Sequence, residues 1–307
     1  MKENSRREIH APRGFNPLKI RPIEHQYADH PSLQPDALRS LARRLYESGT
    51  EKVKFIDPHV QAGSKFILET QVPQNRSIDD IFDNLGSPGT WIAIYEARTD
   101  PEYGDLIDEI IHSGSQMMGE NRDQIFDSDA YIFISSPPSL TPFHIDRENN
   151  LFLQIRGRKQ FTVWDPKDRN TVSEMGVESW IVRGSLADVP WSEDHLHRAA
   201  VHQELGPGEG VFMPSTSAHM SETQGSPRTD RVNESEISVS IGVVYYSALT
   251  RKWANIYALN SFLRKLGWKP QPPGESSETI DSFKYWMGWL ATRTLSRAGR
   301  FRIQRGM

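Results

Sequence analysis

The chain has 307 residues, of which 36% are apolar and 25% charged, as in soluble globular proteins with one large domain or two ordinary ones. A net charge of −4 gives no basic surface for nucleic acid or an anionic membrane, and no apolar segment approaches the roughly 20 residues that span a bilayer. The complete lack of cysteine excludes disulfides, thiolate nucleophiles and cysteine-ligated metals, so that any metal must be held by histidine, carboxylate or backbone oxygen.

Residues 1–35 are polar and rich in proline, arginine and histidine, which predicts a loosely ordered arm. Their basic start has no apolar stretch after it, so we expect no secretory signal and a cytoplasmic protein. Residues 35–49 predict a helix that Asp36 caps and Gly49 ends. Within 53–100, the runs "KFILET" and "TWIAIYEA" predict strands around a helix in "SIDDIFDNL", and "YGDLIDEIIHSG" predicts a further helix.

The pattern changes to short strands between residues 129 and 247, in "AYIFIS", "NLFLQIRGRKQFTVW", "GEGVFMP" and "EISVSIGVVYY". Strands without regular helices between them favour a sandwich or barrel over a βαβ fold. Apolar residues at helical spacing then predict two amphipathic helices, near 254–267 and 279–295. We therefore expect a catalytic or binding domain over 36–250 and a C-terminal helical region over 251–307.

A histidine and an aspartate lie two residues apart in "TPFHIDRENN". In a strand, residues i and i+2 point to the same side, with Cα atoms roughly 6.6 Å apart. His144 and Asp146 can therefore converge on one metal ion, about 2.1 Å from each ligand atom. Alone, the pair is equally typical of a strand-end histidine beside a nearby carboxylate.

The segment after this pair predicts a β-hairpin that turns at Gly157-Arg158. In that hairpin Arg156 faces Lys159, Gln154 faces Phe161, and Phe152 faces Val163. Lys159 then shares a sheet face with Asn150, Phe152 and Gln154. A lysine in such surroundings suggests an anion bound in a pocket, because an unpaired buried ammonium is costly; an edge lysine that reaches solvent is the alternative.

The third element is "GPGEGVFMPSTSAH", in which a short apolar strand leads towards His219. A second imidazole returned to His144 and Asp146 completes a set of two histidines and one carboxylate. Such a facial triad leaves three adjacent coordination positions open and is diagnostic of non-haem Fe(II) oxygenases.

These motifs, in this order, resemble the JmjC/cupin-like 2-oxoglutarate oxygenases. Closest in pattern is the asparaginyl hydroxylase branch that acts on hypoxia-inducible factor. The resemblance is detailed from Thr141 to Trp164 (T-P-x-H-x-D, Asn four after the Asp, F-x-Q-I, a basic residue, Gly and Lys) and looser from Gly208 to Tyr245. It implies a double-stranded β-helix, or jelly roll, with helical flanks, and oxidative decarboxylation of 2-oxoglutarate by O2 coupled to substrate hydroxylation.

The resemblance also implies residue roles. His144, Asp146 and His219 would hold Fe(II), and Lys159 and Thr141 would bind the distal carboxylate of 2-oxoglutarate. Asn150 would lie beside the cosubstrate, and Tyr95 is the nearest match to a further cosubstrate contact. In the family, a polar residue on the last strand helps to hold the cosubstrate. The corresponding position here is near Gly242, which has no polar side chain, so this contact is left undefined. The C-terminal helices would form a homodimer.

Other functions stay open. The rivals are a cupin-like module that binds a metal or a protein without turnover, and a cupin isomerase that needs no 2-oxoglutarate. For an oxygenase the substrate is a protein or peptide side chain or a small molecule, and hydroxylation is not distinguished from demethylation. The cluster of His195, His197 and His202 predicts a solvated insert between strands, with a second metal site as the alternative.

Overall fold

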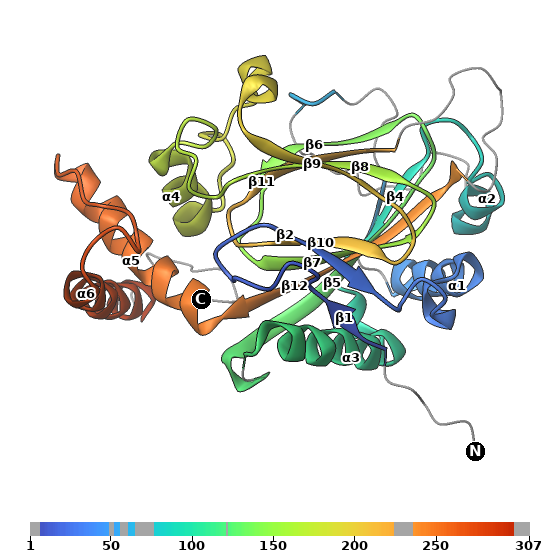
Figure 1. Cartoon of the computed structure of the whole chain (residues 1–307), viewed down its shortest axis with the longest axis horizontal. Helices are drawn as coiled ribbons and strands as arrows, with labels where there is room; N and C mark the ends of the chain where they lie inside the picture. Colours follow the sequence, from blue (N-terminus) through green and yellow to red (C-terminus); the bar gives the residue numbers. More distant parts are fainter. Residues whose placement is uncertain are drawn as a thin grey trace.

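The computed structural model describes residues 7–48, 52–55, 61–64, 77–120, 122–223 and 236–297. Two antiparallel sheets lie face to face at its centre (Figure 1). The eight-stranded sheet has the order β1 (Ile9–His10), β2 (Arg21–His25), β10 (Glu209–Met213), β7 (Asn149–Arg156), β12 (Ser238–Ser247), β5 (Ile125–Ser135), β4 (Trp91–Ile94), β3 (Val53–Phe55). The four-stranded sheet has the order β6 (Ser139–Ile145), β11 (Ala218–Thr223), β8 (Lys159–Trp164), β9 (Ala200–Leu205). The mainly β jelly-roll core predicted from the sequence is confirmed.

Six α-helices flank the sheets in the described parts of the chain (Figure 1). They are α1 (Pro35–Glu47), α2 (Ile78–Asp83), α3 (Pro101–Met118), α4 (Glu174–Arg183), α5 (Ala248–Lys265) and α6 (Glu278–Arg297). Among the residues described, none of these helices is both long and apolar enough to cross a membrane.

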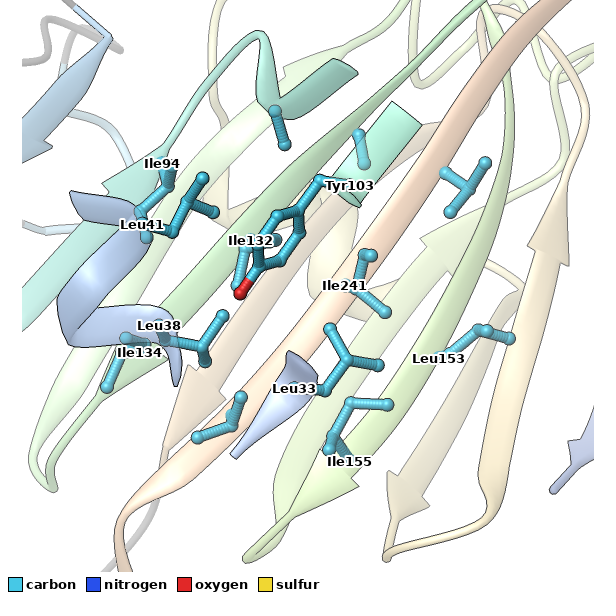
Figure 2. Close-up of a cluster of buried hydrophobic side chains, with 14 of the residues drawn as sticks. Leu33, Leu38, Leu41, Ile94, Tyr103, Ile132, Ile134, Leu153, Ile155 and Ile241 are labelled. Atoms are coloured by element: carbon cyan, nitrogen blue, oxygen red, sulfur yellow. The ribbon is translucent and has the colours of Figure 1, made fainter. Parts of the chain in front are cut away.

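The main hydrophobic core lies on the outer side of the eight-stranded sheet, where α1 and α3 cover it. Figure 2 shows Leu38 and Leu41 of α1 near Ile132 and Ile134 of β5, with Leu153 of β7 and Ile241 of β12 in the same cluster. Alternate residues of the same strands, such as Phe133, Phe152 and Ser240, therefore face the other sheet. This alternation separates an apolar outer face from an inner face that carries polar and aromatic side chains.

A second core lies on the outer side of the four-stranded sheet. There Phe143 and Ile145 of β6 contact apolar residues of α4 and α5. An ion pair between Arg264 of α5 and Glu178 of α4, at 3.0 Å, links these two helices. α6 packs on α5, and the two helices confirm the predicted C-terminal pair. The division into domains at residue 250 stays a prediction.

The predicted hairpin at Gly157-Arg158 is wrong. β7 pairs with β10 and β12, whereas β8 pairs with β11 and β9 in the other sheet. Lys159 is therefore paired with Leu205, and Arg156 with Val239. A two-residue turn between apolar runs has the same sequence signature whether the chain folds back or crosses between sheets. Both edges of β7 are occupied by strands far away in sequence, so β8 cannot join it.

The expected loosely ordered arm is also wrong for the described part of residues 1–35. β1 and β2 pair with each other, and β2 pairs with β10, so this segment extends the eight-stranded sheet. α1 begins after Gln34, whose side chain makes no capping bond, and Asp36 lies in the first turn instead of at the cap. The proline at position 35 explains this start, because proline favours the first helical position. The run "KFILET" and Gly49 lie outside the described residues.

The crossing between the sheets makes Gly157 a sensitive position. It has φ +64°, and a Cβ there would lie 2.5 Å from the carbonyl oxygen of Ile237. Gly119 is a matched control, since its φ is +65° with nothing within 4 Å of such a Cβ. We expect Gly157→Ala to lower the free energy of unfolding by more than about 2 kcal/mol and Gly119→Ala by about 1 kcal/mol. Urea denaturation measures both, and equal losses would contradict the close approach.

Candidate functional site

Three potential metal ligands meet between the two sheets. His144 of β6 lies directly opposite His219 of β11, and Asp146 follows the end of β6. Nε2 of His144 is 3.9 Å from Oδ1 of Asp146, and Nε2 of His219 is 3.6 Å from Oδ2. One ligand atom from each residue lies within 4.8 Å of the others, and the described residues contain no second such group. These separations suit three donors about 2.0–2.2 Å from one ion.

A β-bulge brings a fourth residue to the same side. The pairing of β6 with β11 shifts by one residue between His219 and Ser221, so β6 carries one extra residue between Thr141 and His144. Residues three apart in a regular strand point to opposite faces, whereas the bulge lets both Thr141 and His144 face the space between the sheets. Both line the same pocket.

Backbone carbonyls fix the orientation of both imidazoles. Nδ1 of His144 lies 2.7 Å from the carbonyl oxygen of Pro142, and Nδ1 of His219 lies 3.0 Å from that of Ser217. When Nδ1 donates to a carbonyl, the lone pair is on Nε2 and available to a metal. Burial, followed by the neighbouring His219, lowers the pKa of His144 to about 4, so this imidazole is neutral near pH 7. Both histidines therefore present metal-binding nitrogens.

The triad lines a pocket of about 270 Å³. Phe133 of β5, Phe152 of β7 and Phe161 of β8 form an apolar part of its lining. Phe152 and Phe161 are in contact across the two sheets, with ring centroids 4.6 Å apart. Phe161 also stacks against the His219 ring, with an interplanar angle of 12°. The pocket therefore combines a polar triad with an enclosed apolar wall, as small-molecule sites do.

Lys159 of β8 is buried between the two sheets and is not among the residues that line this pocket. Only 2% of the surface of Lys159 is exposed, and its Nζ donates a hydrogen bond to Oγ of Ser135 at 3.4 Å. Ser135 in turn contacts Oγ1 of Thr223 at 2.7 Å, and no carboxylate of the described residues pairs with the ammonium. Burial lowers the pKa of Lys159 to about 8. A buried cation without a counter-charge fits a bound carboxylate, as predicted, although the hairpin that suggested it is wrong.

Arg156, which the predicted hairpin placed opposite Lys159, lies away from the central pocket. It lines a different surface hollow together with Gln34 of the chain before α1 and Phe82 of α2. Thr141 lines the central pocket and accepts a bond from the Trp91 indole N–H at 3.3 Å, which leaves its hydroxyl hydrogen available to a ligand.

Asn150 also faces the pocket, from β7. A Cβ on Gly242 of β12 would lie 3.1 Å from its Oδ1, so the glycine leaves room for this amide. Oδ1 is buried and has no hydrogen-bond partner among the residues that the structure describes. Because buried amides are normally bonded, this orphaned oxygen indicates that Asn150 interacts with a ligand or an ordered water.

Tyr95, which directly follows the last residue of β4, lines the same pocket. Its ring contacts Tyr131 of β5, with centroids 4.7 Å apart. Burial, followed by the charge of Asp146, raises the pKa of Tyr95. Its predicted contact with the cosubstrate stays a prediction.

The histidine cluster divides between core and surface. His195, in a short 3-10 helix (Glu193–His197), is buried beside Phe143 and Trp191, with ring centroids 4.9 and 5.4 Å away. His197 is exposed, and His202 bonds to Thr162 across β8 and β9. The three histidines thus form no metal site within the described part of the chain.

Four residues at this site were not predicted from the sequence: Ser135 and Thr223 beside Lys159, and Tyr131 and Glu148 on the pocket wall. Alternation along β5 could have identified two of them, because Tyr131, Phe133 and Ser135 share one face. Nothing local marks Thr223 or Glu148.

A jelly roll that holds two histidines and a carboxylate between its sheets defines the cupin class of metal-binding protein. The chain belongs to the Cupin-like domain family, which residues 43–248 match. A comparison with curated proteins finds no match.

Solved structures of similar shape include YcfD, a ribosomal oxygenase from Escherichia coli. One YcfD structure is 13% identical in sequence; its match covers 92% of this chain and 67% of the YcfD chain, with a TM-score of 0.44. Another, of YcfD in complex with cobalt and 2-oxoglutarate, is 16% identical, with coverages of 93% and 63% and a TM-score of 0.43. The chain thus spans about two thirds of the length of these proteins.

Proposed function

We propose that the protein is an Fe(II)- and 2-oxoglutarate-dependent oxygenase that hydroxylates a substrate, with a protein or peptide side chain favoured over a small metabolite. The observation that carries this proposal is the presence of two features between the same two sheets. An open facial triad lines the central pocket, and Lys159 is buried between β8 and β5, outside the residues that line the pocket, with no ion pair to a carboxylate of the described residues. A cytoplasmic location stays a prediction from the sequence.

Each residue has a defined task in this proposal. His144, Asp146 and His219 hold the metal through two imidazoles and one carboxylate. Lys159 and Thr141 bind the distal carboxylate of 2-oxoglutarate, and the aromatic wall excludes water from it. Iron and 2-oxoglutarate, when bound, supply with O2 the oxidising chemistry, and the products are hydroxylated substrate, succinate and CO2.

Visible absorbance under argon separates this proposal from its rivals. We expect a new band when 2-oxoglutarate is added to the iron-loaded protein, because the cosubstrate chelates two of the open metal positions. A cupin isomerase or a silent metal-binding module would explain the metal-binding triad. Neither function would explain why Lys159 and Thr141 are present. For either rival, 2-oxoglutarate would leave the spectrum unchanged, which would contradict the proposal.

The pKa of Lys159 gives the cosubstrate affinity a defined pH dependence. The ammonium is charged below pH 8 and loses its proton above it, so the affinity for 2-oxoglutarate should fall as pH rises through about 8. The fall approaches tenfold per pH unit. Calorimetry on the manganese-loaded protein measures it. A Lys159→Arg variant that still binds should give a flat profile, since guanidinium does not titrate there. A flat wild-type profile would contradict a role for the Lys159 charge.

We also propose that two copies assemble through α5 and α6. Eight of the twelve exposed large apolar residues in the described chain lie in this region: Phe262, Leu266, Trp268, Ile280, Phe283, Trp286, Trp289 and Leu290. α6 is held closely against α5, because a Cβ on Gly288 would lie 2.0 Å from the carbonyl oxygen of Asn255. The exposed side chains therefore point away from this contact, and a patch of this size typically marks an interface.

Light scattering tests the dimer. We expect twice the chain mass of 35.1 kDa for the wild type, and a dimer at least about a hundredfold weaker for Trp286→Arg. Met175→Arg is the control, because Met175 of α4 is 55% exposed and Trp286 is 54% exposed. A wild type that runs at 35.1 kDa would contradict the proposal.

A further inference from the structure

Two buried hydroxyl groups lie beside the ammonium of Lys159. Nζ of Lys159 donates to Oγ of Ser135 at 3.4 Å, and Oγ of Ser135 lies 2.7 Å from Oγ1 of Thr223. Ser135 belongs to β5 of the eight-stranded sheet, whereas Lys159 and Thr223 belong to β8 and β11 of the other sheet. Each of the three residues is at most 2% exposed. A chain of contacts therefore joins the two sheets in the interior of the protein.

The ammonium sets the direction of the hydrogen bonds in this chain. A lysine ammonium carries three donors and no acceptor, so Oγ of Ser135 must accept from it. The hydroxyl hydrogen of Ser135 is then available to Oγ1 of Thr223, which lies at a normal hydrogen-bond distance. Ser135 thus turns its oxygen towards Lys159, and Thr223 keeps it in that orientation.

The surroundings of the ammonium contain hydroxyl and amide groups instead of charges. Ser135 is paired with Ser238 of β12, whose Oγ accepts from Nε2 of Gln154 of β7 at 2.9 Å. Burial lowers the pKa of Lys159 to about 8, and in the described chain no titratable side chain of the packed strands β5, β7, β9, β11 and β12 adds to this shift by its charge. Oγ of Ser135 is the only acceptor that the described residues offer to Nζ. An acceptor favours the charged form of its donor.

We propose that Ser135 and Thr223 are positioning residues, which hold the Lys159 ammonium in its charged form and in place for the distal carboxylate of 2-oxoglutarate. The proposal rests on the proposed function, because that function gives Lys159 this ligand. Ser135 takes one of the three ammonium hydrogens, so two remain for the carboxylate. At 3.4 Å the contact with Ser135 is long for a hydrogen bond, so it orients the ammonium without competing strongly with the ligand.

The pH dependence of cosubstrate binding tests this role. Ser135→Ala removes the acceptor, so the pKa of Lys159 should fall further below its usual range. The affinity for 2-oxoglutarate should then decline at a lower pH than in the wild type, with the midpoint moved by at least about half a unit, or about threefold in the proton dissociation constant. Calorimetry on the manganese-loaded protein under argon measures the profile from about pH 6 to about pH 9.

The two ends of this profile separate positioning from a structural role. At the acidic end Lys159 is charged in both proteins, so wild type and Ser135→Ala should bind 2-oxoglutarate about equally. At the basic end the variant should bind more weakly. A loss of affinity that is the same at every pH would mean that the serine only supports the fold, and it would overturn the proposal.

Variants of Thr223 test the second hydroxyl. Thr223→Val keeps the shape without the hydroxyl and should move the midpoint in the same direction, whereas Thr223→Ser keeps the hydroxyl and should leave the midpoint in place. Ser136→Ala is the matched control, because Ser136 is 1% exposed and bonds instead to the backbone of Ser87 and Thr90. If Ser135→Ala does not fold, this pair decides, since equal midpoints in Thr223→Val and Thr223→Ser would contradict the chain.

Nuclear magnetic resonance of protein with isotope-labelled lysine Cε follows the same proton without cosubstrate. The signal of Lys159 is identified by its absence from Lys159→Met. We expect a titration midpoint near pH 8 in the wild type and at a lower pH in Ser135→Ala or Thr223→Val. Unshifted midpoints in both variants would overturn the proposal, whether or not 2-oxoglutarate binds. A shifted midpoint in a protein that binds no 2-oxoglutarate would instead count against the proposed function alone.

Discussion

Alanine at His144 or His219 is expected to weaken divalent metal binding at least about a hundredfold and to abolish turnover. Each change removes one of three donors, and loss even of an indirect partner of a ligand costs ten- to a hundredfold in affinity. The fold should survive, because the bond of each imidazole to a nearby carbonyl contributes only about 1 kcal/mol. Equilibrium dialysis with manganese measures the affinity, and circular dichroism follows the fold.

His202→Ala is the matched control for these variants. His202 is exposed on β9, outside the triad, and its loss should leave metal binding unchanged. Asp146→Ala should behave like the histidine variants in buffers without chloride or formate, which can fill the vacant position. Wild-type metal affinity in His144→Ala or His219→Ala would end the assignment of the triad.

The second large effect is expected at Lys159. Lys159→Ala should raise the concentration of 2-oxoglutarate needed for half-saturation by one to two decades and leave metal affinity unchanged. A charge-assisted hydrogen bond to a carboxylate contributes roughly 1.5–3 kcal/mol. Anaerobic titration of the iron-loaded protein, followed by visible absorbance, measures the change.

Two controls accompany this variant. Lys159→Met removes the charge but fills the buried space, so it separates the lost charge from a cavity left by alanine. Lys167→Ala removes a charge from an exposed position and should have no effect. If Lys159→Met needs the same concentration of 2-oxoglutarate for half-saturation as the wild type, the ammonium does not bind the cosubstrate. Arg156 could not take over this role in the variant, because it lines another hollow.

The parts of the site that the sequence predicted depend on short-range geometry. His144 and Asp146 converge because alternate strand residues share a face, and His219 follows β10, a strand that β-propensity and the flanking glycines and prolines predicted. The helices of the C-terminal region were predictable for the same reason, since their apolar spacing is local.

The parts that could not be predicted depend on pairing between distant segments. β7 takes β10 and β12 as neighbours, which forces β8 into the other sheet and makes the predicted hairpin a crossing. The contact of Ser135 with Thr223 joins residues 88 positions apart, and that of Tyr246 with Glu148 joins residues 98 apart. Likewise, the segment before α1 carries little local strand signal, and its strands β1 and β2 pair with each other and, through β2, with the distant β10.

Formation of succinate tests the central claim most directly. The purified protein is loaded with Fe(II) and given 2-oxoglutarate in air, without added substrate, and succinate is measured against the same mixture under argon. Slow succinate formation that needs iron and O2, and that is lost in His219→Ala, is the result we predict. No succinate above the argon control, or an equal amount from His219→Ala, would contradict an oxygenase centred on His144, Asp146 and His219.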